Sequence, residues 1–302
     1  MKLGLVTSGS GGILGMAEEA RAAEADGFDH YAVPSIYSHD PISICTVAGV
    51  HTSRIRLLTG VAPVYPRHPA AMASAALSAG AAAGGRFTLG IGLSHQAVVE
   101  GVYGMSFDRP AAYMREYLDV VLPLLDGQAV DHRGDQFTYR GGFRARDRVE
   151  VPVLIAAMAP VMLRLAGERT NGTILWMAGA RAVSDHVAPR LTRAAENAGR
   201  PAPEIVAMLP LALTSDPAGA REAAQEQFAN YGRLPSYRSM LDESGADGPG
   251  DVAIVGDESA LRRQLEELRD AGVTSFSAWL FDAGPGTQER SREFLASLAP
   301  EL

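Results

Sequence analysis

The chain has 302 residues, of which 47% are hydrophobic, and it carries a formal net charge of −8 at pH 7. This acidic balance argues against a nucleic-acid partner, which would need a basic surface to engage phosphates. The single cysteine, Cys45, excludes an internal disulfide and a thiolate metal cluster, and it suits a reducing compartment.

The sequence gives no sign of an export signal or a membrane segment. The opening MKLGLVTSG has one lysine and a short apolar run, unlike a signal peptide. The Ala-rich stretch from Pro69 to Ala83 is too short to cross a bilayer and contains two serines. We therefore expect a cytoplasmic protein without a membrane partner.

Short apolar strands alternate with helices along the chain. The predicted strands are 3–6, 30–33, 55–59, 87–91, 153–157, 173–176, 205–213 and 275–280. The predicted helices are 16–26, 42–50, one opened by Pro69, 110–125, 161–169, 181–198, 261–270 and 291–298. Continuous apolar strands in βα alternation indicate a parallel sheet covered by helices, and eight such units favour a closed (β/α)₈ TIM barrel. We expect residues 1–302 to form a single domain.

Two stretches interrupt the alternation. Residues 127–151 are polar and rich in Gly and Arg, which predicts an inserted β-hairpin or loop. Residues 228–249 lie between the seventh strand and the helix before the eighth. Long excursions in compact domains are usually functional or disordered, so we expect lids or subunit contacts here.

The segment 56–92 is predicted to form one β-loop-α-β unit, and it restricts the possible classes of protein more than any other stretch. Pro69 suits the first turn of a helix, and His68 before it is pushed to an extended conformation. Gly60 ends an apolar strand. A glycine there indicates either an ordinary turn or a close approach of the backbone to a ligand.

Three quoted segments carry a resemblance to a known family. They are TGVAPVYPRHPAAMA at 59–73, GGRFTLGIGLSHQAVVEGVYGMSFDRPAAYMREYLDVVLPLLDG at 84–127 and ERTNGTILWMAG at 168–179. Together they resemble the luciferase-like flavin and deazaflavin oxidoreductases, particularly the branch that uses coenzyme F420. The resemblance spans almost the whole chain and implies a bacterial luciferase-like barrel and a homodimer.

The resemblance also implies where the cofactor would lie. The pair Gly60-Val61 would form a non-prolyl cis peptide, part of a backbone bulge that backs the central ring. His68 would order the loop beneath the ring. For the turn 157–161 the sequence alone leaves two readings, an ordinary βα turn or a helix start whose N–H groups bind an anion. The residues we expect to contact the cofactor are Ser35, Gly60, Val61, Ala62, His68, Ala157, Met158, Ala159, Pro160, Met177 and Ala178.

In a barrel of this kind, chemistry belongs at the carboxyl ends of the strands. His95 follows the strand 87–91 and could exchange a proton near neutral pH, or it could simply cap the next helix. In relatives an acidic residue is common at this position, and an Asp-His pair often stands where this chain has Ser35 and Ile36. That departure puts alcohol oxidation in doubt. We expect the proton donor to be His95 or otherwise a bound water.

The substrate pocket is predicted from the same strand ends and the loops that follow them. Its expected residues are Ser8, Tyr37, His39, Tyr103, Met105 and Trp176, with Phe107, Met177 and Phe281 as further apolar lining. This composition indicates an apolar acceptor. F420 has an acidic tail, for which Arg67, Arg164 and Arg181 are candidates.

Two other kinds of site do not fit the sequence. No HExxH or paired Cys/His spacing is present, so we expect no metal. The start SGSGGILG lacks the G-x-G-x-x-G spacing of a dinucleotide site, and no acidic residue ends the second strand.

The sequence thus predicts an F420-dependent oxidoreductase that delivers hydride from reduced F420 to a C=C or C=N bond of a small organic acceptor. Two alternatives stay open at this point. One keeps the fold but binds flavin mononucleotide and activates oxygen, as luciferase-like monooxygenases do. The other is a cofactor-free barrel that acts as a binding protein.

Overall fold

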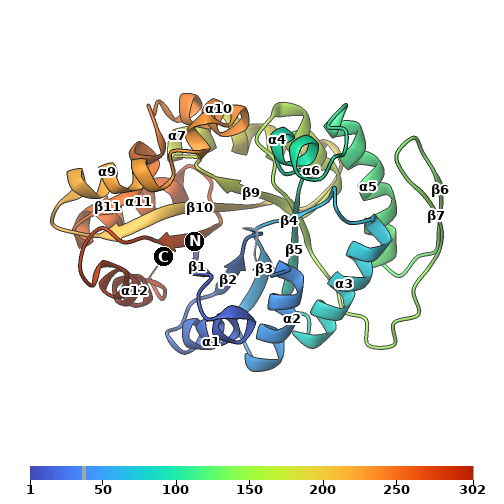
Figure 1. Ribbon diagram of the computed structural model, residues 1–302, viewed down its shortest axis with the longest axis horizontal. Helices are drawn as coiled ribbons and strands as arrows, with labels where there is room; N and C mark the ends of the chain where they lie inside the picture. The colour runs from blue at the N-terminus through green and yellow to red at the C-terminus, as the bar shows by residue number, and fades with distance from the viewer. Residues whose placement is uncertain (36–38, 302) are drawn as a thin grey trace.

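Eight parallel strands close into a barrel in the computed structural model, which describes residues 1–35 and 39–301 (Figure 1). Each strand pairs with the next, and the last pairs with the first. The expected TIM-barrel fold is thereby confirmed. In barrel order the strands are β1 (Lys2–Val6), β2 (His30–Val33), β3 (Arg56–Thr59), β5 (Phe87–Gly92), β8 (Val153–Ile155), β9 (Gly172–Trp176), β10 (Glu204–Leu213) and β12 (Ser275–Leu280).

Within the described residues, four further strands lie outside this cycle. The two-residue β4 (Ala62–Pro63) pairs with the end of β5, and β11 (Ile254–Gly256) pairs with the end of β10. The strands β6 (Val130–Arg133) and β7 (Thr138–Gly141) form an antiparallel hairpin. This hairpin lies within the excursion 127–151, where a hairpin or loop was expected, and Figure 1 shows it at the edge of the molecule beyond α5.

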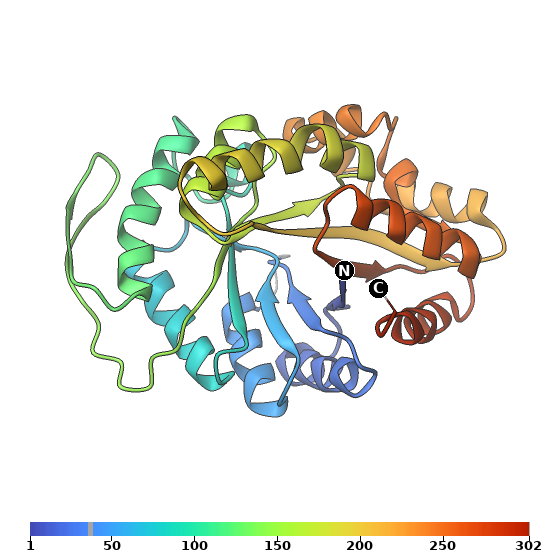
Figure 2. The same cartoon turned by 180° about the vertical axis from the view of Figure 1, so that it is seen from behind.

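Helices cover the outside of the barrel, as both views show (Figure 2). They are α1 (Gly12–Ala25), α2 (Pro41–His51), α3 (Pro69–Ala82), α4 (Gln96–Gly101), α5 (Pro110–Leu125), α6 (Pro160–Arg169), α7 (Ala180–Ala182), α8 (Ala188–Asn197), α9 (Pro217–Gln227), α10 (Pro235–Ser244), α11 (Glu258–Asp270) and α12 (Thr287–Leu298). Many begin at a proline, because the first turn needs no N–H from that residue.

The sequence prediction differs from the structure in several elements. The helices α4, α9 and α10 and the strand β11 were not predicted, because their short or Ala-rich stretches lack a clear apolar period. Residues 181–198 were expected to be one helix, but a π-helical turn at Val183–Val187 separates α7 from α8. The excursion 228–249 is largely helical and contains α10.

A polar layer forms the amino-terminal floor of the barrel. Arg56 at the start of β3 makes two hydrogen bonds, 2.8 and 2.6 Å long, to Glu204 at the start of β10. Ser275 donates to the same carboxylate at 2.7 Å. The His30 imidazole is fully buried and lies 2.7 Å from the Ser277 hydroxyl. These contacts join four barrel strands beneath an apolar core.

We expect His30 alone to make the protein lose about 2 kcal/mol of stability between pH 8 and pH 5. Burial, assisted by the charge of Arg56, lowers the pKa of His30 to about 3, against an ordinary value of 6.5. The unfolded chain therefore binds a proton that the folded protein excludes, so stability falls as the pH falls below 6.5. Urea unfolding at pH 8, 6.5 and 5 measures the loss. The variant His30→Gln should lose the pH dependence, and an equal loss in that variant would show that other groups cause it.

Candidate functional site

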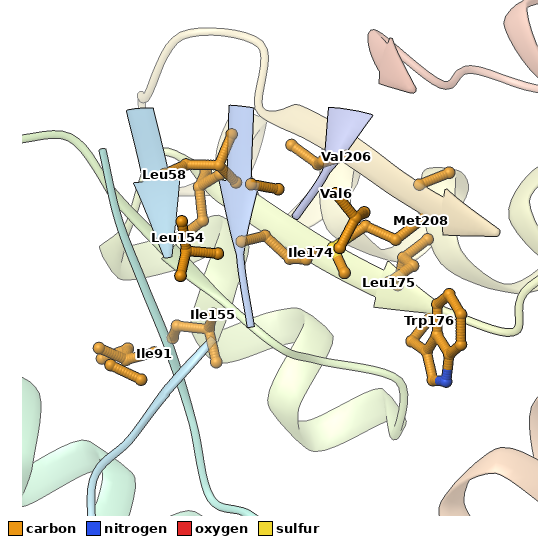
Figure 3. Packing of buried hydrophobic residues seen from close by; sticks show 14 of the residues in the cluster. Val6, Leu58, Ile91, Leu154, Ile155, Ile174, Leu175, Trp176, Val206 and Met208 are labelled. Atoms are coloured by element: carbon orange, nitrogen blue, oxygen red, sulfur yellow. The ribbon is translucent and has the colours of Figure 1, made fainter. Parts of the chain in front are cut away.

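Several side chains point into the barrel near its mouth, by which we mean the end where the carboxyl ends of the strands meet. A Cβ added to Gly90 would meet Ile174, and one added to Gly60 would meet Met208. These residues therefore point into the barrel. Side chains two apart on a strand share a face, so Trp176, two residues after Ile174 on β9, also projects inward at the mouth (Figure 3).

Residues 60 and 61 form a bulge at this mouth. The strand β5 pairs first with β3 and then with β4, and between the two sets of pairs the β3–β4 segment contains one residue more than β5. The Thr59 hydroxyl donates to the Gly90 carbonyl at 2.7 Å across the interruption. The peptide bond between Gly60 and Val61 is cis, as the resemblance implied.

The mouth beside this bulge is lined by small residues. A Cβ at Gly60 would lie 3.0 Å from the Met208 sulfur and 3.8 Å from the Ala32 side chain. One at Gly92 would lie 2.7 Å from the Val61 side chain. Ala62 follows the bulge and is buried. The Met208 side chain packs against Gly60, and the Val61 side chain packs against Gly92.

His95 lies just past β5, at the position before the first turn of α4. Its side chain makes no capping hydrogen bond to that helix. Its ring centroid is 5.4 Å from that of Tyr237 on α10. Burial lowers the pKa of His95 below its ordinary value of 6.5. An imidazole in this setting is free to exchange a proton with a bound molecule.

A group of aromatic rings lies at the ends of β9 and β12 and on the excursion 228–249. The Trp176 ring lies 5.5 Å from both Phe228 and Tyr231 and 5.4 Å from Trp279, between centroids. Tyr231 in turn lies 5.2 Å from Tyr237, which contacts His95. We call this group the aromatic wall, which comprises Trp176, Phe228, Tyr231, Tyr237, Trp279 and Phe281.

Most of the aromatic wall was missed in the sequence, which pointed only to Trp176 and Phe281. Phe228, Tyr231 and Tyr237 belong to the excursion 228–249, which folds back so that its rings lie against the strand ends. A usable signal existed, because three aromatic residues fall within ten positions of a chain that is 7% aromatic. Figure 1 shows α10 along the same edge of the molecule as α4, α6 and α7. The excursion thus supplies three rings of the aromatic wall.

The strand ends of β8 and β9 hold the predicted phosphate contacts. The turn from β8 into α6 leaves the amino end of that helix without a side-chain cap, so N–H groups of its first turn are free for an anion. The carbonyl oxygen of Met158 lies 2.8 Å from a ring nitrogen of His186. The predicted residues in this region are Ala157, Met158, Ala159 and Pro160 after β8, and Met177 and Ala178 after β9.

Met177 has a left-handed backbone, with φ of 59°, and is fully buried. A residue with a Cβ rarely adopts this conformation, and such residues gather at ligand sites. The next glycine, Gly179, donates its N–H to the Ser244 hydroxyl of α10 at 3.0 Å. The end of β9 is therefore tied to the excursion that carries the aromatic wall.

The loop after β1 is organised by Glu19, a residue that sequence reasoning missed. Its carboxylate accepts hydrogen bonds from the hydroxyls of Thr7, Ser8 and Tyr31. Burial would raise the pKa of Glu19, but these hydrogen bonds outweigh it and hold the pKa below its usual value. Ser8, a predicted pocket residue, is exposed and directed to this carboxylate.

The remaining predicted residues are dispersed around the mouth. Ser35 and His39 are exposed on either side of residues 36–38, and Tyr37 lies outside the described residues. Tyr103 and Met105 follow α4, where Tyr103 is half-buried and Met105 exposed. Their contact with a substrate stays a prediction.

His68 occupies the position before α3, where its Nδ1 accepts the N–H of Ala70 at 3.1 Å. Its ring packs against Phe137 and Tyr139 of the hairpin region, with centroids 5.6 and 6.1 Å away. A helix-capping role explains the hydrogen bond. The predicted contact between His68 and a cofactor is therefore untested by this geometry.

The three candidate arginines differ in their settings. Arg67 is bound to Asp40 at 2.7 Å, which links the loops after β2 and β4. Arg164 and Arg181 are exposed on α6 and α7 and face carboxylates 3.8 and 3.9 Å away. Pairs this exposed contribute little to stability, so both side chains can turn toward an anionic ligand near the ends of β8 and β9.

Two hollows lie in the surface, and the second reaches the strand ends through Ser8 and Trp279. One, of about 610 Å³, lies between α3 and residues 143–148, and the other, of about 770 Å³, lies between β1, α1 and α12. In the described part of the chain, no His, Cys, Asp and Glu side chains gather as a set of three that could hold a metal ion. No helix within 1–35 and 39–301 is long and apolar enough to cross a membrane.

These features define an α/β barrel with a candidate ligand site at the carboxyl ends of its strands. The chain belongs to the luciferase-like monooxygenase family, whose sequence profile matches residues 4–275. It is 28% identical over 309 residues to a 5,10-methylenetetrahydromethanopterin reductase of Methanolobus tindarius, covering 92% of this chain and 94% of that protein.

Two further comparisons agree with this assignment. A putative coenzyme F420-dependent oxidoreductase of Mycobacterium tuberculosis is 29% identical over 306 residues, covering 85% of this chain and 88% of that protein. The solved structure of the coenzyme F420-dependent tetrahydromethanopterin reductase from Methanopyrus kandleri superposes with a TM-score of 0.81 at 22% identity, covering 98% of this chain and 97% of that one. The structural likeness supports the barrel fold.

Proposed function

We propose that this protein is an F420-dependent oxidoreductase that transfers hydride from reduced F420 to a C=C or C=N bond of a small organic acceptor. The observation that carries the proposal is the end-to-end match to relatives, one of which is named as F420-dependent. The match runs through the strands whose ends form the mouth. It makes a redox cofactor the natural occupant of that mouth.

The residues present at the mouth fit such a cofactor. A flat ring system suits a segment of small residues, which Gly60, Val61 and Ala62 supply beside β5, with the Met208 side chain packed against Gly60. A phosphate needs uncapped backbone N–H groups, which the first turn of α6 offers. Arg164 and Arg181 stand nearby for an acidic tail. We assign the ring to the bulge and the phosphate to the turn 157–161 with Met177 and Ala178.

When bound, reduced F420 supplies two electrons as a hydride. The protein supplies position and exclusion of water, because holding the two reacting carbons together removes much of the entropic barrier. The aromatic wall closes one side of the site to water. His95 supplies the proton that completes the reduction, since its ring is unengaged by α4 and lies at the mouth.

We further propose that residues 1–302 act as one domain in a homodimer. The family resemblance supports this assembly. Light scattering coupled to size-exclusion chromatography should then give about twice the chain mass of 31.9 kDa.

Binding of F420 tests the proposed function directly. Titration of oxidised F420 with the purified protein should quench its blue-green fluorescence and saturate at one cofactor per chain. Reduced F420 should then be consumed when enones or cyclic imines are added. Protein that is purified yellow, with absorbance near 450 nm, would instead identify a flavin enzyme. If the protein shows no saturable binding of F420 or of flavin mononucleotide, the remaining hypothesis is a cofactor-free binding protein.

A further inference from the structure

The indole N–H of Trp176 is a buried hydrogen-bond donor without an acceptor among the described residues. The residue is 8% exposed and ends β9 at the mouth. Buried polar groups are almost always partnered, and an unpartnered one is a reason to look for a missing ligand. Figure 3 shows the indole nitrogen on the side of the ring away from Leu175 and Met208, so the donor faces away from the core.

Among the described residues, aromatic rings surround this indole. Phe228, Tyr231 and Trp279 enclose the indole at 5.4 to 5.5 Å. Their faces suit a flat, unsaturated molecule. The other unpartnered buried groups of the described residues lie elsewhere, in the barrel floor, in the loop after β4 and on the hairpin, and are His30, Arg56, Tyr65, Arg67 and His132.

A second polar group stands at the other end of the same aromatic wall. Ring contacts run from Trp176 through Tyr231 and Tyr237 to His95, with centroids 5.5, 5.2 and 5.4 Å apart. His95 does not cap α4. A flat molecule lying along the wall thus meets a hydrogen-bond donor at one end and a titratable group at the other.

Resting on the proposed function, we propose that the acceptor is a conjugated carbonyl compound whose oxygen accepts a hydrogen bond from Trp176 Nε1. The indole N–H only donates. A carbonyl oxygen keeps lone pairs for such a donor throughout the reaction. A C=N bond is reduced as its protonated form, whose nitrogen carries a hydrogen and offers the indole no lone pair. The donor therefore selects C=C–C=O over C=N.

The reaction balances with the partners already named. Hydride adds to the β carbon of the conjugated carbonyl compound, and the electron pair of the C=C bond moves toward the carbonyl oxygen. The N–H of Trp176 stabilises the charge that develops on this oxygen. A proton from His95 then reaches the α carbon and gives the saturated ketone. The two electrons come from reduced F420, which is oxidised.

The variant Trp176→Phe tests the assignment because it keeps a ring and removes the N–H. With 2-cyclohexen-1-one and reduced F420, kcat/KM should fall about tenfold, in line with the loss of one hydrogen bond to a developing oxyanion. The affinity for oxidised F420, measured by fluorescence quenching, should stay unchanged. An unaltered kcat/KM would overturn the proposal.

A spectroscopic readout follows the hydrogen bond itself. The chain has two tryptophans, so the ¹⁵N-labelled protein gives two indole N–H signals, and Trp279→Phe leaves only that of Trp176. In this variant loaded with oxidised F420, the unreactive ligand cyclohexanone should shift the Trp176 proton signal downfield. Cyclohexane, of the same shape without the oxygen, should not.

The two hypotheses fail in different ways. If oxidised F420 does not bind, the proposed function fails. If F420 binds but the Trp176 signal stays in place at saturating cyclohexanone, the N–H points at the face of a neighbouring ring and the carbonyl assignment is wrong. Faster turnover of the cyclic imine 1-pyrroline than of 2-cyclohexen-1-one would also overturn it.

Discussion

Replacing Gly90 by alanine is expected to destabilise the protein by about 3 kcal/mol or more, the upper range for overpacking a close-packed core. A Cβ on this residue would lie 2.0 Å from the Thr59 carbonyl oxygen and 2.5 Å from the Ile174 side chain. The carbonyl belongs to the main chain of β3, directly before the bulge. It cannot move without breaking the pairing between β3 and β5, which we call the β3–β5 seam. The N–H of Gly90 is also held by the Thr59 hydroxyl at 2.9 Å.

Thermal unfolding followed by circular dichroism measures this effect. At roughly 2–4 °C per kcal/mol for a chain of this size, Gly90→Ala should lower the Tm by about 10 °C or prevent recovery of folded protein. The matched control is Gly101→Ala. A Cβ at Gly101 would meet nothing within 4 Å and would favour the helix α4, by up to about 1 kcal/mol. A Tm within 2 °C of the wild type for Gly90→Ala would show that the seam opens more easily than its geometry indicates.

The seam also shows how far the sequence could predict the fold. The apolar strand 55–59, the glycine at its end and the proline that opens the next helix are local signals, and each appears in the structure within a residue or two. The bulge at 60–61 came from the family resemblance and is present. Local dihedral preferences and short apolar runs are properties that a sequence carries openly.

The aromatic wall shows what the sequence could not predict. Tyr237 and Tyr231 meet His95 and Trp176 only because the excursion 228–249 folds back toward the strand ends, and that placement depends on contacts between residues far apart in the chain. Gly179, for instance, meets Ser244. No local pattern encodes such a contact. Glu19 was hidden for the same reason, because its partners are the loop after β1 and Tyr31 of the next strand.

The position of His95 combines both kinds of information. Its place directly after a barrel strand could be predicted, because the strand 87–91 is continuous and apolar. The sequence could not predict that its side chain leaves α4 uncapped and contacts Tyr237 instead. This contact places the imidazole against the aromatic wall, and burial lowers its pKa. The proposed proton donor is therefore set by the excursion as much as by the barrel.

Replacing His95 by glutamine is expected to lower kcat/KM for 2-cyclohexen-1-one about 100-fold, the lower range for loss of a general acid. Glutamine keeps a polar side chain but cannot deliver a proton. The wild type should also show a pH dependence. Because burial lowers the pKa of His95 below 6.5, the protonated form is abundant only in acid, and kcat/KM should fall as the pH rises through that pKa. Initial rates of reduced F420 oxidation between pH 5 and 8 measure both effects.

The pH profile separates a proton donor from a residue that only packs against Tyr237. A packing role predicts that His95→Gln loses rate equally at every pH and keeps the wild-type profile. If His95 is the proton donor, the fall of kcat/KM with rising pH, which we call the falling limb, should disappear in the variant, because the group whose protonation controls the rate is gone. The control His51→Gln changes an exposed histidine at the end of α2 and should keep the limb. Retention of the limb in His95→Gln would assign the proton to bound water or to another side chain at the mouth.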